Sequence, residues 1–524
     1  MPSRMKSSMT LAAIAVGLMV AAGSTFAQEQ QAPPEPAEVS VTVYSTADPA
    51  GFDPQQFIAQ QRQGHNPDFA WQVPGFGVVK EVRPVEFDEG RNTIRFTDVA
   101  QFIDPTTVSF TDLTDPDATA VLEQQFLFDL VSSEKLLEKY VDQEITVFVP
   151  TGADGEMEAV EGTLLSAIGG ELVLRTDAGI RLLRRSADTQ VQLGELPGGL
   201  ITRPTLAWLV NSAAAGERQV RTTYQTAGIT WRADYNLILD DDETSADLGA
   251  WVSLMNLSGA TYENARLKLI AGDVQRIEPQ RPQPMRMEME RAAAGIVQDQ
   301  AFEQRPFFEY HLYTLPRPTT VAQNTTQQIT LFPTTHDVAV EKVLVYYGLP
   351  ESQHWGMFPQ PRTDRGLGTE ANEKVDVYLR FDNSEDNNLG MPMPAGKVRV
   401  FKEDPADETL EFVGEDLIDH TPRDEELLIK LGQSFDIVGE RTQTNFTIDQ
   451  RAHVMTETFR IQLRNHQDEP VQVLVKENLY RWVNWEITDA SDDFEKIDAR
   501  TIHFGVEVPA GGEKTVTYTV RYTW

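Results

Sequence analysis

The chain has 524 residues, no cysteine and a formal net charge of −35. At roughly 100–200 residues per domain, this length allows two to four domains with large cores. The absence of cysteine excludes disulfides, thiolate metal sites and thiol nucleophiles. The acidity disfavours contact with nucleic acid and with anionic lipid, and no nucleic-acid partner is expected.

The first 27 residues have the pattern of a secretory signal peptide. Arg4 and Lys6 form a basic start, residues 9–22 are apolar, and Thr25-Phe26-Ala27 is a small-residue cleavage site. The apolar run is shorter than the ~20 residues that a spanning helix needs, and no later segment approaches that length. The sequence therefore predicts a periplasmic or secreted protein that is cleaved after Ala27 and has no transmembrane segment.

The remaining chain divides by composition into a linker and three parts. Residues 28–38 form a linker rich in proline and glutamine, and residues 39–140 read as an N-terminal β domain. Residues 141–195 contain short strands between glycine turns, which is typical of a small SH3-like or Sm-like barrel. Residues 196–524 are predicted to form a C-terminal β-sandwich domain. A proline-rich stretch at 274–306 interrupts it and is expected to be a disordered or mobile excursion.

The most regular pattern lies in residues 229–273, which predict three consecutive antiparallel strands. In the first strand, apolar side chains at odd positions alternate with polar ones such as Arg232 and Asp234. This period of two indicates one buried face and one wet face. The acidic run 240–243 is predicted to be a solvated hairpin connection.

Strands of this kind recur along most of the chain, and helical patterns are scarce. One short helix is predicted near residues 135–140, where Ser132 and Ser133 can begin it. Strands that follow one another without intervening helices exclude βαβ units. The predicted fold class is therefore all-β, with mainly antiparallel β-sandwich domains, a small barrel insert and few short helices.

Several stretches resemble an exported bacterial family known as domain of unknown function 4139, which is distantly similar to proteins named mucoidy inhibitors. They are ITWRADYNLIL with WVSLMNLSGATYENARLKLIAGDV, PAGKVRVFKED, GEDLIDHTPRDEELLIKLGQSFDIVGERTQTNF and WEITDASDDFEKIDARTIHFGVEVPAGGEKTVTYTVRYTW. The resemblance covers residues 206–524 and implies a two-part envelope protein with a C-terminal β-sandwich and no assigned activity. Mucoidy-inhibitor-like proteins have a coiled coil between the two parts, where this chain has the barrel-like segment. The family lends no catalytic residues.

One turn gathers several groups that could do chemistry. Asp416, Asp419, His420 and Asp424 lie close together in the sequence. A hard metal ion or a proton-transfer pair could use these carboxylates and this imidazole, so this turn leaves a divalent cation open as a cofactor. The structural alternative is that Asp419 and Thr421 satisfy backbone groups of the loop.

Other motifs point less clearly to a site. The sequence has no GxSxG, HExxH or GxxxxGK[ST] motif. The loop 382–388 has oxygen-bearing side chains at alternating positions, but Met393 stands where a calcium loop needs a glutamate. Thioethers at Met285, Met287 and Met289 are soft ligands for Cu(I), although the charges between them favour an ordinary polar segment.

These observations favour an exported, non-enzymatic β protein that binds or scaffolds an unknown envelope protein or glycan. One alternative is a metal-dependent hydrolase or cation-binding protein that uses the Asp416–Asp424 turn. Another is carbohydrate binding on exposed aromatic rings such as Trp355, Trp482 and Trp485. The apolar neighbours of Trp482 and Trp485 favour core positions for both.

Overall fold

The computed structural model describes residues 38–45, 73–150, 156–186, 188–195, 200–272, 274, 302–349, 360–369, 371–407 and 409–524. The predicted signal peptide, most of the linker and of the proline-rich excursion, the methionine run and Trp355 lie outside these residues. Of the described residues, 66% are in strands and 2% in helices, which confirms the all-β prediction. No helix among the described residues is long and apolar enough to cross a membrane.

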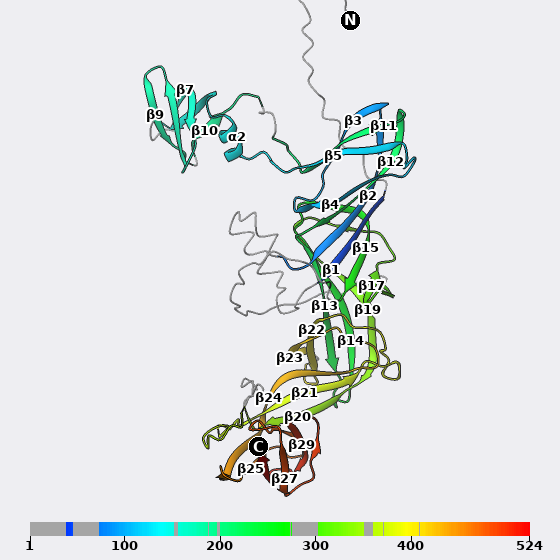
Figure 1. Cartoon of the computed structure of the whole chain (residues 1–524), viewed down its shortest axis with the longest axis vertical. Helices are drawn as coiled ribbons and strands as arrows, with labels where there is room; N and C mark the ends of the chain where they lie inside the picture. The colour runs from blue at the N-terminus through cyan, green and yellow to red at the C-terminus, as the bar shows by residue number, and fades with distance from the viewer. Residues whose placement is uncertain are drawn as a thin grey trace, which may run out of the picture.

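Two sheets form the N-terminal end of the molecule (Figure 1). An eight-stranded sheet has the order β16-β17-β15-β1-β2-β12-β4, with β18 also paired to β15, and a three-stranded sheet has the order β3-β11-β5. The strands are β1 Glu38–Ser45, β2 Phe76–Phe87, β3 Gly90–Thr97, β4 Ile103–Asp112, β5 Thr119–Leu127, β11 Thr205–Ser212, β12 Gly216–Thr226, β15 Tyr262–Ala271, β16 Glu303–Phe307, β17 Tyr310–Thr314 and β18 Thr319–Val321.

A small five-stranded sheet stands to one side of this body (Figure 1). Its order is β10-β6-β7-β8-β9, and it packs with helix α2 around its own core. Ser132 caps α2 as predicted, because its side chain accepts a hydrogen bond of 3.1 Å from the Lys135 amide. The sheet is not closed, so the barrel prediction was wrong in this respect. The elements are α2 Ser133–Lys139, β6 Glu144–Pro150, β7 Met157–Ser166, β8 Glu171–Thr176, β9 Gly179–Arg184 and β10 Gln190–Gln192.

The middle of the molecule is a five-stranded sheet with the order β19-β14-β13-β22-β23. Its apolar face shares one continuous core with the two N-terminal sheets, and this core includes Trp208, Trp231 and Tyr235. The strands are β13 Ile229–Leu239, β14 Ser245–Asn256, β19 Thr325–Ala339, β22 Gly396–Asp404 and β23 Thr409–Ile418.

A nine-stranded sheet forms the C-terminal end, in the order β27-β30-β25-β24-β21-β20-β26-β29-β28. The rings of Phe504 in β29 and Tyr518 in β30 are 5.7 Å apart although their strands are distant in this order. The sheet therefore folds over on itself as a sandwich with its own core. The elements are β20 Glu341–Tyr347, β21 Lys374–Asp382, η3 Glu385–Asn387, β24 Glu426–Asp449, β25 Val454–Asn465, β26 Val471–Asn478, β27 Trp485–Ala490, β28 Glu495–Lys496, β29 Thr501–Val508 and β30 Glu513–Thr523.

The three strands predicted in residues 229–273 are present as β13, β14 and β15, but only the first two form an antiparallel pair. β15 joins the N-terminal sheet and runs parallel to β1, with Val41 opposite Leu267. Part of the expected wet face of β13 is also buried. Arg232 and Asp234 are 9% and 3% exposed, because they form ion pairs within the fold.

Candidate functional site

Asp416, the first residue of the acidic turn singled out by the sequence, lies near the end of β23 and joins two sheets. Its Oδ2 accepts a hydrogen bond of 2.7 Å from the backbone amide of Lys430 in β24, and its Oδ1 accepts one of 2.9 Å from the Leu417 amide. β23 belongs to the middle sheet and β24 to the C-terminal sheet. Both carboxylate oxygens of Asp416 therefore serve the backbone at this junction.

His420 and the residues around it fasten the turn to the segment before β22. The Nδ1 atom of His420 accepts a hydrogen bond of 3.0 Å from the Ala395 amide. Thr421 exchanges two backbone hydrogen bonds, each of 2.9 Å, with Met393. The Thr421 hydroxyl donates to the Asp419 carbonyl at 2.9 Å. These bonds agree with the structural alternative, in which the turn satisfies its own backbone groups.

The remaining carboxylate of the turn, Asp424, has a left-handed backbone with φ of 63°. Its amide donates to the Asn383 carbonyl at 2.8 Å. The Asn383 side chain is fully buried and donates to the carbonyls of Met391 and Pro422, both at 2.8 Å. The loop 382–388 is thus connected to the acidic turn by hydrogen bonds from the Asp424 amide and the Asn383 side chain.

Metal binding by this turn finds no geometric support. Within the described residues, no group of three or more His, Asp or Glu side chains is placed so that it could hold a metal ion. Asp416, Asp419, His420 and Asp424 are therefore not brought together as one ligand set. Their use as metal ligands remains a prediction of the sequence.

The structure reveals two buried ion pairs in the C-terminal sandwich that the sequence analysis missed. Glu477 accepts hydrogen bonds from Arg441 Nε at 2.9 Å and from the Tyr518 hydroxyl. Arg481 Nε lies 2.7 Å from Glu457 Oε2, an ion pair without hydrogen-bond geometry. All four charged side chains are at most 2% exposed.

The two arginines of these pairs also hold the loop before β21. Arg441 donates to the Gly368 carbonyl at 2.8 Å, while Arg481 donates to the carbonyls of Arg362, Asp364 and Leu367 at 2.7–3.0 Å. Burial without such partners would cost several kcal/mol per ion. The ion pairs are therefore a structural clamp that holds the loop before β21 against the sandwich.

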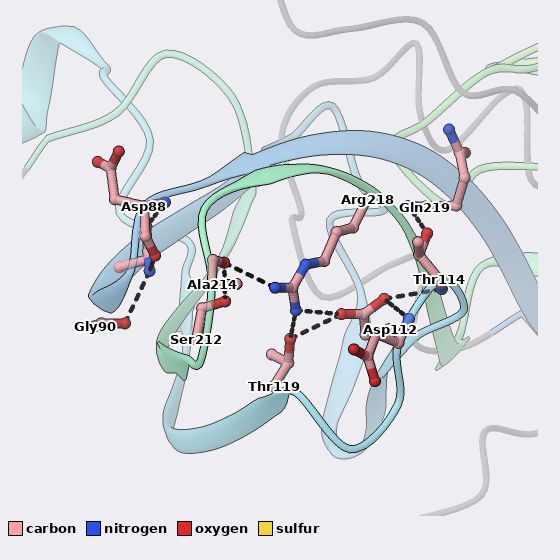
Figure 2. A network of polar contacts seen from close by, with 11 residues as sticks. Asp88, Gly90, Asp112, Thr114, Thr119, Ser212, Ala214, Arg218 and Gln219 are labelled. Atoms are coloured by element: carbon pink, nitrogen blue, oxygen red, sulfur yellow. Dashed lines mark hydrogen bonds and ion pairs between the residues drawn. The ribbon is translucent and has the colours of Figure 1, made fainter.

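A second clamp lies at the N-terminal end (Figure 2). Arg218 Nη1 donates to Asp112 Oδ2 at 2.9 Å and to the Thr119 hydroxyl at 2.8 Å, and its Nη2 donates to the Ala214 carbonyl at 2.7 Å. Arg218 and Asp112 are both nearly buried. The contact joins the turn after β4 to the hairpin between β11 and β12.

Asp112 is held in its ionised form by the groups around it. Burial alone would raise the pKa of its carboxyl. Hydrogen bonds from the Asp115 and Thr114 amides, the Thr119 hydroxyl and Arg218 outweigh burial and place that pKa below its ordinary value of 3.8. The arrangement stabilises the carboxylate, so it does not suit Asp112 to proton transfer near neutral pH.

The two tryptophans proposed for carbohydrate binding lie against the C-terminal core, as their neighbours suggested. Trp482 and Trp485 are partly buried apolar residues packed on that core. Trp485 Nε1 donates to the Ala499 carbonyl at 2.7 Å, and Lys496 lies over its ring at 4.4 Å from the centroid. The Trp485 ring is therefore partly covered by Lys496 and fixed by its hydrogen bond to Ala499.

Two pockets among the described residues are places where a small molecule could bind. The larger, of about 570 Å³, is lined by Arg83, Asp98, Arg203 and Tyr262 among others. Both arginines form ion pairs with carboxylates: Arg83 with Glu81, and Arg203 with Asp98. The smaller pocket, of about 230 Å³, lies at the junction of the middle and C-terminal sheets.

Comparison with known proteins identifies the chain by family only. No curated protein matches it. The family described as "Domain of unknown function (DUF4139)" matches residues 220–524, which is more than half of the chain. That match begins in β12 and includes the middle sheet, the acidic turn and the whole C-terminal sandwich. The protein therefore belongs to the DUF4139 family.

Proposed function

We propose that the protein is exported to the cell envelope and acts there by binding or scaffolding a protein partner, without catalysis. Its buried carboxylates support this proposal, because those described above are held by arginines and backbone amides that fix the fold. Asp416 and His420 of the acidic turn are likewise held by backbone amides. The titratable groups of these clamps thus hold loops and strands of the fold together.

The observation that carries the proposal is the outer strand of the small sheet. β9 pairs only with β8 among the described strands, so one of its backbone edges is open. Ile180 and Leu182 on this strand are 69% and 68% exposed, and Ile168 in the turn before β8 is 82% exposed. An open strand edge with alternating apolar side chains is suited to adding a strand from another protein.

Site-specific photo-crosslinking tests this surface. A photoreactive residue at Leu182 is expected to give a discrete crosslinked product in whole cells, because its side chain faces outward at the open edge. The matched control is Leu122, an exposed leucine of β5 in another sheet. If position 182 gave no product, or the same products as position 122, the binding proposal would be wrong.

Export has its own test. Alkaline phosphatase, which is active only after export, is fused after residue 40 and assayed in intact bacteria. Activity that is lost when the basic residues Arg4 and Lys6 are replaced by glutamate supports export through residues 1–27. An inactive fusion that accumulates in the cytoplasm would contradict it. Hydrolysis of glycans, esters or peptides that is abolished by His420→Ala would favour the hydrolase alternative instead.

A further inference from the structure

The pocket of about 230 Å³ lies where the middle sheet meets the C-terminal sheet. One wall comes from β13 and β23, and the other from β21 and β24. The walls are mainly apolar, with side chains from both sheets: Leu239, Val377, Leu379, Val413 and Leu431. This volume is below the roughly 300–1,000 Å³ of sites for drug-sized molecules, so the pocket suits a smaller ligand.

Two β-bulges line this pocket, one on each sheet. In β23, Gly414 is opposite Val400 and Phe412 is opposite Phe401, so Val413 is the extra residue. In β24, the register with β21 likewise leaves Leu431 as an extra residue between Lys430 and Gly432. Bulges redirect side chains and often accompany functional sites. Here both extra residues belong to the pocket lining.

The rim of the pocket carries two lysines that share one carboxylate. Glu243 lies in the hairpin between β13 and β14. Its Oε1 accepts a hydrogen bond of 2.8 Å from Lys402 of β22, and its Oε2 accepts one from Lys342 of β20. Among the residues that line the pocket, two ammonium groups stand against one carboxylate. Asp240, Asp241 and Asp242 belong to the same hairpin but do not line the pocket.

Glu243 is ionised at neutral pH and is placed to compete for the lysines. Burial alone would raise the pKa of its carboxyl, but Lys342 and Lys402 outweigh burial and hold that pKa below its ordinary value of 4.5. The residue lies in a surface turn with φ of 61°, and its side chain is 30% exposed. Its carboxylate can therefore move outward without disturbing a strand.

We propose that this pocket binds a small carboxylate with an aliphatic tail, such as a medium-chain fatty acid. The carboxylate takes the place of the Glu243 carboxylate on Lys342 and Lys402. The tail lies among the five apolar side chains, where its removal from water drives binding. A bound ligand would contact both sheets and would stiffen their junction. This inference does not depend on export or on the β9 surface.

Equilibrium dialysis of the full-length chain against labelled octanoate tests the proposal. Saturable binding is expected, with 1-octanol and acetate as probes that lack the carboxylate and the tail, respectively. Both should bind at least about tenfold more weakly than octanoate. Octanol binding as tightly as octanoate, or no saturable octanoate binding at all, would overturn the proposal.

The decisive variant is Glu243→Gln. If Glu243 competes with the ligand, this change frees the two lysines and tightens octanoate binding by about tenfold. If Glu243 served only to hold the hairpin, the same change would leave binding unchanged or weaken it, and that result would refute the proposed role. A urea unfolding curve for each variant confirms that it is folded.

Two further variants with matched controls locate the ligand. Lys402→Met should weaken octanoate binding by about tenfold, while Lys374→Met, an exposed lysine of β21 outside the lining, should not change it. Val413→Trp should fill the pocket and abolish binding. Phe412→Trp is its control, since Phe412 is the neighbouring exposed residue and lies outside the pocket lining. Equal effects of both tryptophan substitutions would contradict a site in this pocket.

Discussion

The carboxylate of Asp416 in β23 accepts a hydrogen bond of 2.7 Å from the backbone amide of Lys430 in β24. These two strands belong to different sheets and share no ladder, so a side chain makes the connection that strand pairing does not. The close approach of Gly414 supports the same junction, because a Cβ at that position would lie 2.4 Å from the Leu431 carbonyl oxygen. Asp416 is therefore a structural residue of the junction between the middle and C-terminal sheets.

Replacing Asp416 by alanine should destabilise the protein. The change removes two hydrogen bonds and leaves the Lys430 amide without its partner, so the free energy of unfolding should fall by about 1–3 kcal/mol. Urea unfolding measures this loss. Asp419→Ala is the matched control, because Asp419 accepts the Thr421 hydrogen bond through its backbone carbonyl, which alanine retains. Equal losses in the two variants would argue against the proposed role of Asp416.

Replacing Glu477 by glutamine should be far more costly. It leaves the guanidinium of Arg441 buried without its counter-charge, and such a change typically costs about 3–5 kcal/mol. Glu440→Gln on β24 is the control, since Glu440 pairs with Arg464 at 3.2 Å on a partly exposed surface and should cost about 0–1 kcal/mol. Chemical unfolding of both variants would show whether burial of the pair matters as described.

The clamp of Asp112 and Arg218 predicts a pH-dependent contribution to stability. Because the folded pKa of Asp112 is lowered, its carboxylate stabilises the fold above pH 3.8, and this contribution is lost as the pH falls through the folded pKa. Asp112→Asn should thus cost about 1.5–3 kcal/mol near pH 7 and progressively less below pH 3.8. Urea midpoints from pH 7 to pH 3 test this. A difference that stays constant with pH, or a similar effect of Asp88→Asn nearby, would contradict it.

Trp231 should contribute through its ring nitrogen as well as through burial. Its Nε1 donates to the Val43 carbonyl at 3.1 Å and so joins β13 to β1 inside the main core. Trp231→Phe removes this donor and part of the ring, and we expect a loss of about 1–3 kcal/mol in the free energy of unfolding. An unchanged urea midpoint would show that the contact between these strands does not depend on Trp231.

The alternation in residues 229–239 was enough to predict a strand and its apolar face, because period two reflects local geometry. It was not enough to predict that Arg232 and Asp234 are buried. Asp234 also binds Arg399 at 3.1 Å, and that partner comes from β22, 165 residues later in the chain. From local sequence alone, a polar strand face is predicted to be in solvent. Its burial can be predicted only when the strand that supplies the opposite charges is known.

Local sequence patterns likewise could not predict which strands pair or whether a sheet closes into a barrel. The short strands of residues 141–195 were recognised from their glycine turns, but whether the last strand closes a barrel depends on curvature that composition does not reveal. In the same way, the acidic turn was visible as a cluster of charges. The engagement of Asp416 by Lys430, and of His420 by Ala395, depends on backbone groups that any residue type could supply.

Asp416 and His420 accept hydrogen bonds from backbone amides that tie the acidic turn to neighbouring segments of the fold. The most direct measurement is the thermal midpoint of protein purified without chelator, for the wild type and Asp416→Ala, with and without calcium, manganese or zinc. We predict that Asp416→Ala lowers the midpoint by the same amount in every condition, and that no metal raises it. A metal that raises the midpoint of the wild type but not of Asp416→Ala would instead show that the turn binds that metal through Asp416.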